Sequence, residues 1–180
     1  MKTDNSHFEE KVRLRALAIT GMENIKVLEC YAGMSTLWEE VKKRTGKRIE
    51  VTRIEKIKGK CPLPHLVGDN SKYLFAMDLD RYEIIDLDAY GIPAEQMEII
   101  IEKGYKGTII ITAIQSVMGR MPDIVLKALG YTDGMIAKAP SLLCTNGLEK
   151  FLKYLYFNNI IGYKGYFFPK KYYFICKQEA

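Results

Sequence analysis

The chain has 180 residues, of which 48% are hydrophobic and 27% are charged, a composition that predicts one domain over residues 1–180 and excludes a disordered chain. The net charge of +5 is a mild basic excess, which permits a nucleic-acid partner without requiring one. The sequence contains no apolar run of the ~20 residues that a membrane helix needs and no apolar stretch of the signal-peptide type near its start. We therefore expect a cytoplasmic protein with no membrane partner.

The four cysteines lie far apart in the sequence, at positions 30, 61, 144 and 176. They form no Cys-x-x-Cys pair, and only two histidines are present to assist them. A zinc site usually needs such a cluster of nitrogen and sulfur ligands. The sequence therefore predicts no metal site, and it favours free thiols in a reducing compartment.

A helical pattern covers residues 4–20, although its apolar stripe is imperfect. Its basic residues at every second position are Lys11, Arg13 and Arg15. We expect these three side chains on the solvated face of the helix, and a role in binding phosphate is the alternative.

Five apolar segments then predict buried strands, and segments with helical spacing separate them. The predicted strands cover residues 25–29, 49–55, 66–67, 82–87 and 107–112. Such alternation is typical of an α/β fold with a parallel sheet and helices on both faces. A capping box is also predicted, with Thr36 and Glu39 at the start of the first intervening helix.

Two aromatic runs close the chain, at residues 161–168 and 171–176, on either side of a Phe-Pro-Lys-Lys turn. They predict an antiparallel hairpin at the edge of the sheet. Its tyrosines and lysines have two interpretations: they could stack on and grip a nucleic acid, or they could form the wet face of an edge hairpin.

The stretch Val27–Trp38 is the first candidate for a binding site. An apolar strand ends in Glu29, Gly33 follows four residues later, and a helical pattern begins at Thr36. A strand, a glycine turn and a helix N-terminus in this order are typical of nucleotide-like ligand sites, because the loop backbone can approach the ligand closely.

Acidic residues also follow the other predicted strands, so the first loop is one of four. The acids are Glu29, Glu55, Asp69 and the pair Asp86 and Asp88. The carboxyl ends of parallel strands meet at one edge of a sheet, where ligands bind in such folds. We therefore expect these carboxylates to line one site.

This arrangement resembles the class I S-adenosylmethionine-dependent methyltransferases, whose first motif is an acid, three residues, a glycine, one residue and a second glycine. Here the motif reads Glu29-Cys-Tyr-Ala-Gly33-Met-Ser35, with serine in place of the second glycine. The resemblance implies a Rossmann-like sheet, S-adenosylmethionine as cofactor, Glu55 on the ribose hydroxyls and Asp69 near the adenine amine. The cofactor-binding residues that it implies are Glu29, Tyr31, Ala32, Gly33, Ser35, Glu55, Lys56, Asp69, Asn70 and Asp86.

The fourth tip reads Asp86-Leu-Asp88-Ala-Tyr90-Gly-Ile-Pro93. It is similar to the Asp-Leu-Asp-Pro-Phe-Gly-Ser-Pro motif of the tRNA guanine dimethyltransferases, with alanine in place of the first proline. The resemblance implies catalytic roles for Asp88, which would accept hydrogen bonds from an exocyclic amine, and for Tyr90, which would stack on the base.

These observations predict methyl transfer from S-adenosylmethionine to a base nitrogen of a nucleic acid, RNA before DNA, by direct displacement. No cysteine lies in the target loop to act as a covalent nucleophile. We expect no separate target-recognition domain, so recognition would use the chain's own loops, a homodimer or a partner protein. The alternatives are a small-molecule or protein methyltransferase on the same fold, and a non-catalytic cofactor-binding or structural subunit.

Overall fold

The computed structural model describes residues 6–115, 121–139 and 143–179. Its strands are β1 (Ile25–Glu29), β2 (Ile49–Glu55), β3 (Leu66–Val67), β4 (Ile84–Asp88), β5 (Thr108–Ile114), β6 (Ile160–Phe168) and β7 (Lys171–Gln178). Its helices are α1 (Phe8–Ala18), α2 (Thr36–Thr45), α3 (Asn70–Ala76), α4 (Ala94–Glu102), α5 (Asp123–Ala128), α6 (Asp133–Lys138) and α8 (Gly147–Phe157), with a short 3-10 helix at Leu79–Arg81.

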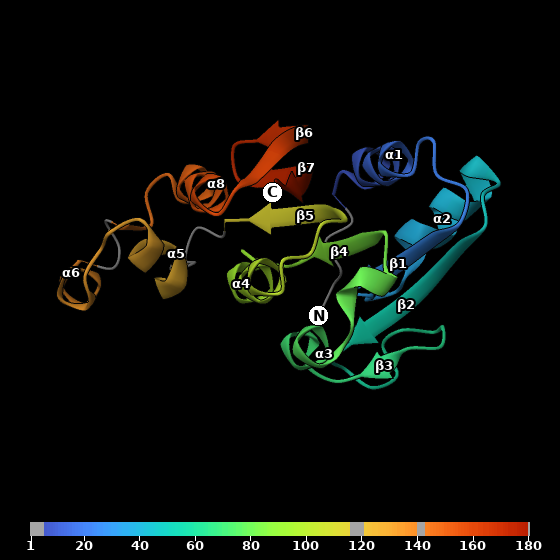
Figure 1. Cartoon of the computed structure of the whole chain (residues 1–180), viewed down its shortest axis with the longest axis horizontal. Helices are drawn as coiled ribbons and strands as arrows, with labels where there is room; N and C mark the ends of the chain where they lie inside the picture. The colour runs from blue at the N-terminus through green and yellow to red at the C-terminus, as the bar shows by residue number, and fades with distance from the viewer. Residues whose placement is uncertain (1–5, 116–120, 140–142, 180) are drawn as a thin grey trace.

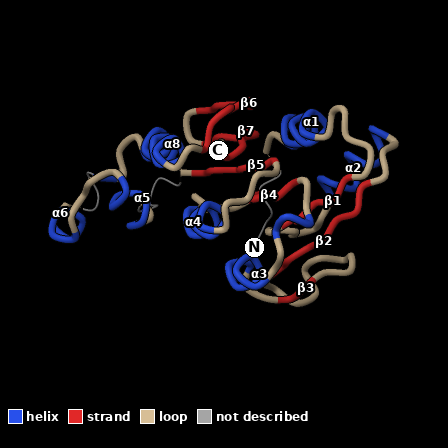
Figure 2. Tube along the Cα trace, viewed as in Figure 1, coloured by secondary structure: helices blue, strands red, loops and turns tan. Residues whose placement is uncertain are grey.

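The described strands form one seven-stranded sheet in the order β3-β2-β1-β4-β5-β7-β6 (Figures 1 and 2). Strands β1 to β5 pair in parallel, whereas β7 runs antiparallel to both β5 and β6. The predicted parallel sheet with a C-terminal antiparallel hairpin is therefore confirmed. The chain leaves β1 toward β2 on one side and returns to β4 on the other, and such a reversal opens a crevice at the carboxyl ends of the strands.

Helices cover both faces of this sheet. Helices α1 and α2 pack against each other on one face, where Trp38 and Val41 of α2 are fully buried against apolar side chains of β1 and β4. Helices α3, α4, α5 and α8 lie over the other face, whose core includes Leu74, Met97 and Phe151. Burial on both faces explains why β5 reads as a nearly continuous apolar run in the sequence. No helix in the described ranges combines the length and apolar character that crossing a membrane requires.

The N-terminal helix differs from its prediction in two respects. It begins at Phe8, and residues 1–5 lie outside the described ranges. Two of its basic side chains, Lys11 and Arg15, are buried at 7% and 1% exposure, and only Arg13 lies on the solvated face. The predicted solvated position of these two side chains was wrong because each forms an ion pair with an aspartate of β4, Lys11 with Asp88 and Arg15 with Asp86.

The predicted capping box at the start of α2 is also wrong. The N-cap residue is Ser35, and no side chain makes a capping hydrogen bond there. Instead, the Glu39 carboxylate accepts a hydrogen bond from the guanidinium of Arg53 on β2. The first turn of α2 is thus tied to the sheet, next to the loop that follows β1.

Candidate functional site

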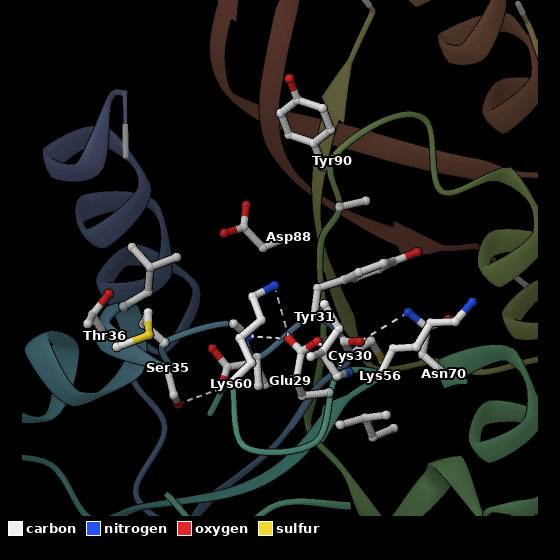
Figure 3. Close-up of a pocket in the computed structure, with 18 of the residues that line it drawn as sticks. Glu29, Cys30, Tyr31, Ser35, Thr36, Lys56, Lys60, Asn70, Asp88 and Tyr90 are labelled. Atoms are coloured by element: carbon white, nitrogen blue, oxygen red, sulfur yellow. Dashed lines mark hydrogen bonds and ion pairs between the residues drawn. The ribbon is translucent and has the colours of Figure 1, made fainter. Parts of the chain in front are cut away.

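A cavity of about 440 Å³ opens at the carboxyl ends of β1, β2 and β4, a size within the roughly 300–1,000 Å³ range of small-molecule pockets (Figure 3). It brings together the predicted site residues from all four strand tips. Those that line it are Glu29, Tyr31, Ala32, Gly33, Ser35, Glu55, Lys56, Asp69, Asn70, Asp88 and Tyr90. Asp86 is not among the residues that line the cavity.

The loop after β1 passes through two left-handed residues, Gly33 and Ser35, each with φ of 52°. Glycine adopts this conformation without steric cost, whereas serine does not. Backbone hydrogen bonds fix the turn, from Ala32 N to Ile54 O at 3.0 Å and from Ser35 N to Ala32 O at 2.6 Å. The serine that departs from the family motif thus occupies a backbone position that favours glycine.

The Ser35 side chain explains how that position is stabilised. Its Oγ donates a hydrogen bond to Glu29 Oε2 at 2.8 Å (Figure 3), and it accepts one from Arg53 Nε. Glu29 is only 3% exposed, and Arg53 lies 3.5 Å from its carboxylate. Burial and the nearby Asp86 charge raise the pKa of Glu29 to about 8, against the opposing effects of Ser35, Arg15 and Arg53. Glu29 is therefore mostly protonated at neutral pH.

Glu55 connects the end of β2 to the same loop. Its Oε2 accepts a hydrogen bond from Gly33 N at 2.9 Å, and its Oε1 accepts one from Ile57 N at 3.0 Å. Lys60 approaches Oε2 at 3.5 Å. A carboxylate offers about four acceptor positions, so each oxygen of this preorganised group retains capacity toward the cavity.

The far wall of the cavity is built around the start of α3. Asp69 Oδ1 accepts from Ser71 N at 3.0 Å and caps this helix, while Oδ2 lies 3.5 Å from Lys56 Nζ. Asn70 Nδ2 donates to Cys30 O at 3.0 Å (Figure 3). These bonds tie α3 to the loop after β1, so the Asp69 carboxylate is held beside the cavity.

Asp86, predicted to bind the cofactor, instead belongs to the core. It is fully buried, accepts hydrogen bonds from Arg15 Nε at 2.7 Å and Nη2 at 2.8 Å, and accepts one from Trp38 Nε1 at 2.6 Å. It shares a sheet face with Asp88 but lies two residues deeper along β4, about 7 Å from the strand end. The prediction was wrong because it treated both aspartates as residues of the strand tip.

Asp88 lies at that tip, and its carboxylate points toward α1 (Figure 3). Lys11 Nζ donates to both of its oxygens, at 2.7 and 3.1 Å, and Arg15 Nη2 lies 3.9 Å away. Burial alone would raise the pKa of Asp88, but the charges of Arg15 and Lys11 outweigh it and hold the pKa below its ordinary value. Tyr90 stands at the cavity rim and is 67% exposed. The site therefore ends in an ionised carboxylate beside an accessible aromatic ring.

Lys11, Arg15 and Arg53 hold these carboxylates, and none of the three was among the predicted site residues. A signal was present for the first two, because an acid inside the apolar strand Ile84–Asp88 must find a cation or a donor. The helix with basic residues at positions 11 and 15, one turn apart, was the available source.

Scans of protein-family models and of curated proteins find no match for this sequence. Solved structures do match its fold. A proposed methyltransferase, yhhF of Escherichia coli, matches with a TM-score of 0.55 at 14% identity, over 100% of this chain and 88% of that one. A proposed rRNA methylase of Clostridium thermocellum matches with a TM-score of 0.56 at 8% identity, over 100% and 99%.

A third similar structure is the plantazolicin methyltransferase BamL in complex with a substrate analogue and SAH, with a TM-score of 0.54 at 10% identity over 96% of this chain and 84% of that one. At these identities the likeness defines the fold alone. The chain has the fold of the class I S-adenosylmethionine-dependent methyltransferases.

Proposed function

We propose that this protein is an S-adenosylmethionine-dependent methyltransferase that acts on a base nitrogen of a nucleic acid, RNA before DNA. The observation that carries the proposal is that carboxylates from the ends of β1, β2 and β4 and from the start of α3 line a single cavity. Fold neighbours described as methyltransferases, one of them with SAH bound and another described as a proposed rRNA methylase, support it.

The cavity suits S-adenosylmethionine on the chemistry of its lining. Glu55 is fixed by two backbone N–H groups and keeps acceptor capacity, which matches two vicinal ribose hydroxyls. The carboxylate of Asp69 would accept from the adenine amine. The positive φ of Gly33 brings the loop backbone against the cavity without a side chain in the way.

At the other end of the cavity, Asp88 and Tyr90 would receive the methyl acceptor. When bound, the cofactor supplies a methyl group on a sulfonium, and transfer forms a nitrogen–carbon bond from the nitrogen lone pair, breaks the carbon–sulfur bond and releases one proton. Asp88, kept ionised by its cationic neighbours, would accept a hydrogen bond from the acceptor amine. Tyr90 would stack on the base. The main contribution of the protein is then to hold two reactants in line.

Methyl transfer from labelled S-adenosylmethionine tests the proposal, with total tRNA, genomic DNA and protein extract compared as acceptors. We expect incorporation into tRNA and its loss in Asp88→Ala. A variant at an exposed position, Glu50→Ala, is the matched control and should keep wild-type incorporation. Transfer that survives Asp88→Ala undiminished would contradict the role of Asp88, and incorporation into protein alone would contradict the acceptor class.

A further inference from the structure

At the acceptor end of the cavity, Asp88 is paired with a donor, Lys11, that the family motif does not supply. Lys11 and Asp88 both line the cavity, and their side chains are 8% and 16% exposed. An ammonium group has three N–H donors. Two of those on Lys11 serve the two Asp88 oxygens, at 2.7 and 3.1 Å, which leaves a third N–H for another partner.

Lys11 is held in this position from several sides. Its Nζ lies 5.3 Å from the centre of the Tyr173 ring on β7, a cation–π distance. Its backbone carbonyl accepts a hydrogen bond from Arg15 Nη1 at 3.1 Å, and that guanidinium is itself bonded to Asp86. The ammonium is thus a fixed feature of the cavity wall and differs from a mobile surface lysine.

The remaining lining at this end is largely apolar. Phe8 lies one turn before Lys11 on α1, Ala89 follows Asp88, and Ile114 ends the neighbouring strand β5; all three line the cavity, and Tyr90 stands at its rim. Lys11 and Asp88 neutralise each other, so the wall presents one donor and one acceptor without a net charge. Such a wall suits an uncharged planar group that carries one hydrogen-bond acceptor and one donor side by side on the same edge.

We propose that Lys11 binds the methyl acceptor directly, and that the acceptor is a base whose pairing edge places an exocyclic amine beside an unprotonated ring nitrogen, as in adenine and cytosine. The amine would donate to Asp88, and the ring nitrogen would accept from Lys11. The pairing edge of guanine places an N–H beside its amine, and uracil has no amine, so neither matches this order of donor and acceptor. The inference rests on the proposed function and narrows the class of base that would accept the methyl group.

Binding of short single-stranded RNA oligonucleotides tests it without relying on turnover. The oligonucleotides are uracil except for one central base, which is adenine, cytosine, guanine or 1-deazaadenine, an analogue that keeps the amine and lacks the ring nitrogen at position 1. Dissociation constants are measured by fluorescence anisotropy, with excess SAH to keep bases out of the cofactor site. The proteins are wild type, Lys11→Met and Arg13→Met, which removes an exposed cation from the same helix.

We expect the wild type to prefer adenine and cytosine, and to bind the 1-deazaadenine oligonucleotide about ten- to a hundredfold more weakly than the adenine one, because a hydrogen bond to a charged donor is lost. Lys11→Met should bind those two oligonucleotides equally, while Arg13→Met should keep the difference. Equal wild-type affinities for adenine and 1-deazaadenine, or a Lys11→Met protein that still separates them, would overturn the proposal.

Two outcomes distinguish a failure of this inference from a failure of the proposed function. If calorimetry finds no SAH binding by the folded protein, the proposed function fails and this inference fails with it. If SAH binds and the bases are not distinguished, only this inference fails. Should Lys11→Met not fold, the wild-type comparison of adenine with 1-deazaadenine decides the question alone.

Discussion

Replacement of Arg15 by methionine tests whether this arginine stabilises the fold by neutralising the buried Asp86. Methionine keeps much of the side-chain volume, but it leaves the fully buried Asp86 with Trp38 Nε1 as its remaining donor among the bonds described above. Removing one partner of a buried ion pair costs about 3–5 kcal/mol. We expect a loss near the lower value, about 3 kcal/mol at pH 7, because Asp86 can escape its unpaired charge by protonation. In a chain of this length that corresponds to a fall in Tm of about 6–12 °C.

Urea denaturation followed by circular dichroism measures the effect, at pH 7 and at pH 5. The pKa of Asp86 is already raised by burial, against the opposing charge of Arg15. Protonation is easier at lower pH, so the loss of stability should be smaller at pH 5. The double variant Arg15→Met with Asp86→Asn removes both charges and should recover most of the loss. Arg13→Met, on the exposed face of the same helix, should stay within about 0.5 kcal/mol of wild type.

A single Arg15→Met variant within about 1 kcal/mol of wild type at pH 7 would contradict a stabilising Arg15–Asp86 ion pair. The same holds for a double variant that is no more stable than the single one. Either result would mean that the Asp86 carboxylate does not depend on Arg15 for its neutralisation.

Three further predictions concern the loop after β1 and the end of β2. The pKa of Glu29 is raised to about 8, so the native state binds this proton more tightly than the unfolded state does. The free energy of unfolding should therefore fall as the pH rises from about 5 to about 8. In urea titrations, the Glu29→Gln variant should show a smaller fall over the same range. An unchanged pH slope would count against a buried, protonated Glu29. Ser35 has positive φ, so Ser35→Ala should be about 1 kcal/mol less stable than Ser35→Gly, and equal stabilities would contradict the strained backbone. Glu55→Ala should weaken S-adenosylmethionine binding about ten- to a hundredfold, as measured by calorimetry. Glu50 is exposed on the same strand, and Glu50→Ala should leave the affinity unchanged. Equal affinities in both variants would argue against ribose binding by Glu55.

The sequence predicted the sheet and most of the cavity lining because both follow from local patterns. The continuous apolar run at β5 and the hydrophobic spacing of α2 specify their elements without knowledge of the rest of the fold. Parallel strands then bring their carboxyl ends to one edge, so the acids Glu29, Glu55 and Asp69 could be placed together from sequence order alone.

The partners of these acids could not be predicted in the same way, because they depend on distant elements. Lys11 lies 77 residues from Asp88 in the sequence, and Arg15 lies 71 residues from Asp86. A basic residue on a helix is normally solvated, so its burial becomes visible only once the helix is known to cover the acid-bearing face of β4. Likewise, Ser35 forms a hydrogen bond with Glu29 in place of a helix cap because its backbone adopts positive φ.

The central claim is that the cavity at the strand ends binds S-adenosylmethionine. Isothermal titration calorimetry of the folded wild-type protein with S-adenosylmethionine tests this most directly. We expect saturable binding with one ligand per chain, and displacement of the ligand by SAH. A folded protein that shows no binding at millimolar ligand would contradict it and would leave the chain a structural subunit with a methyltransferase fold.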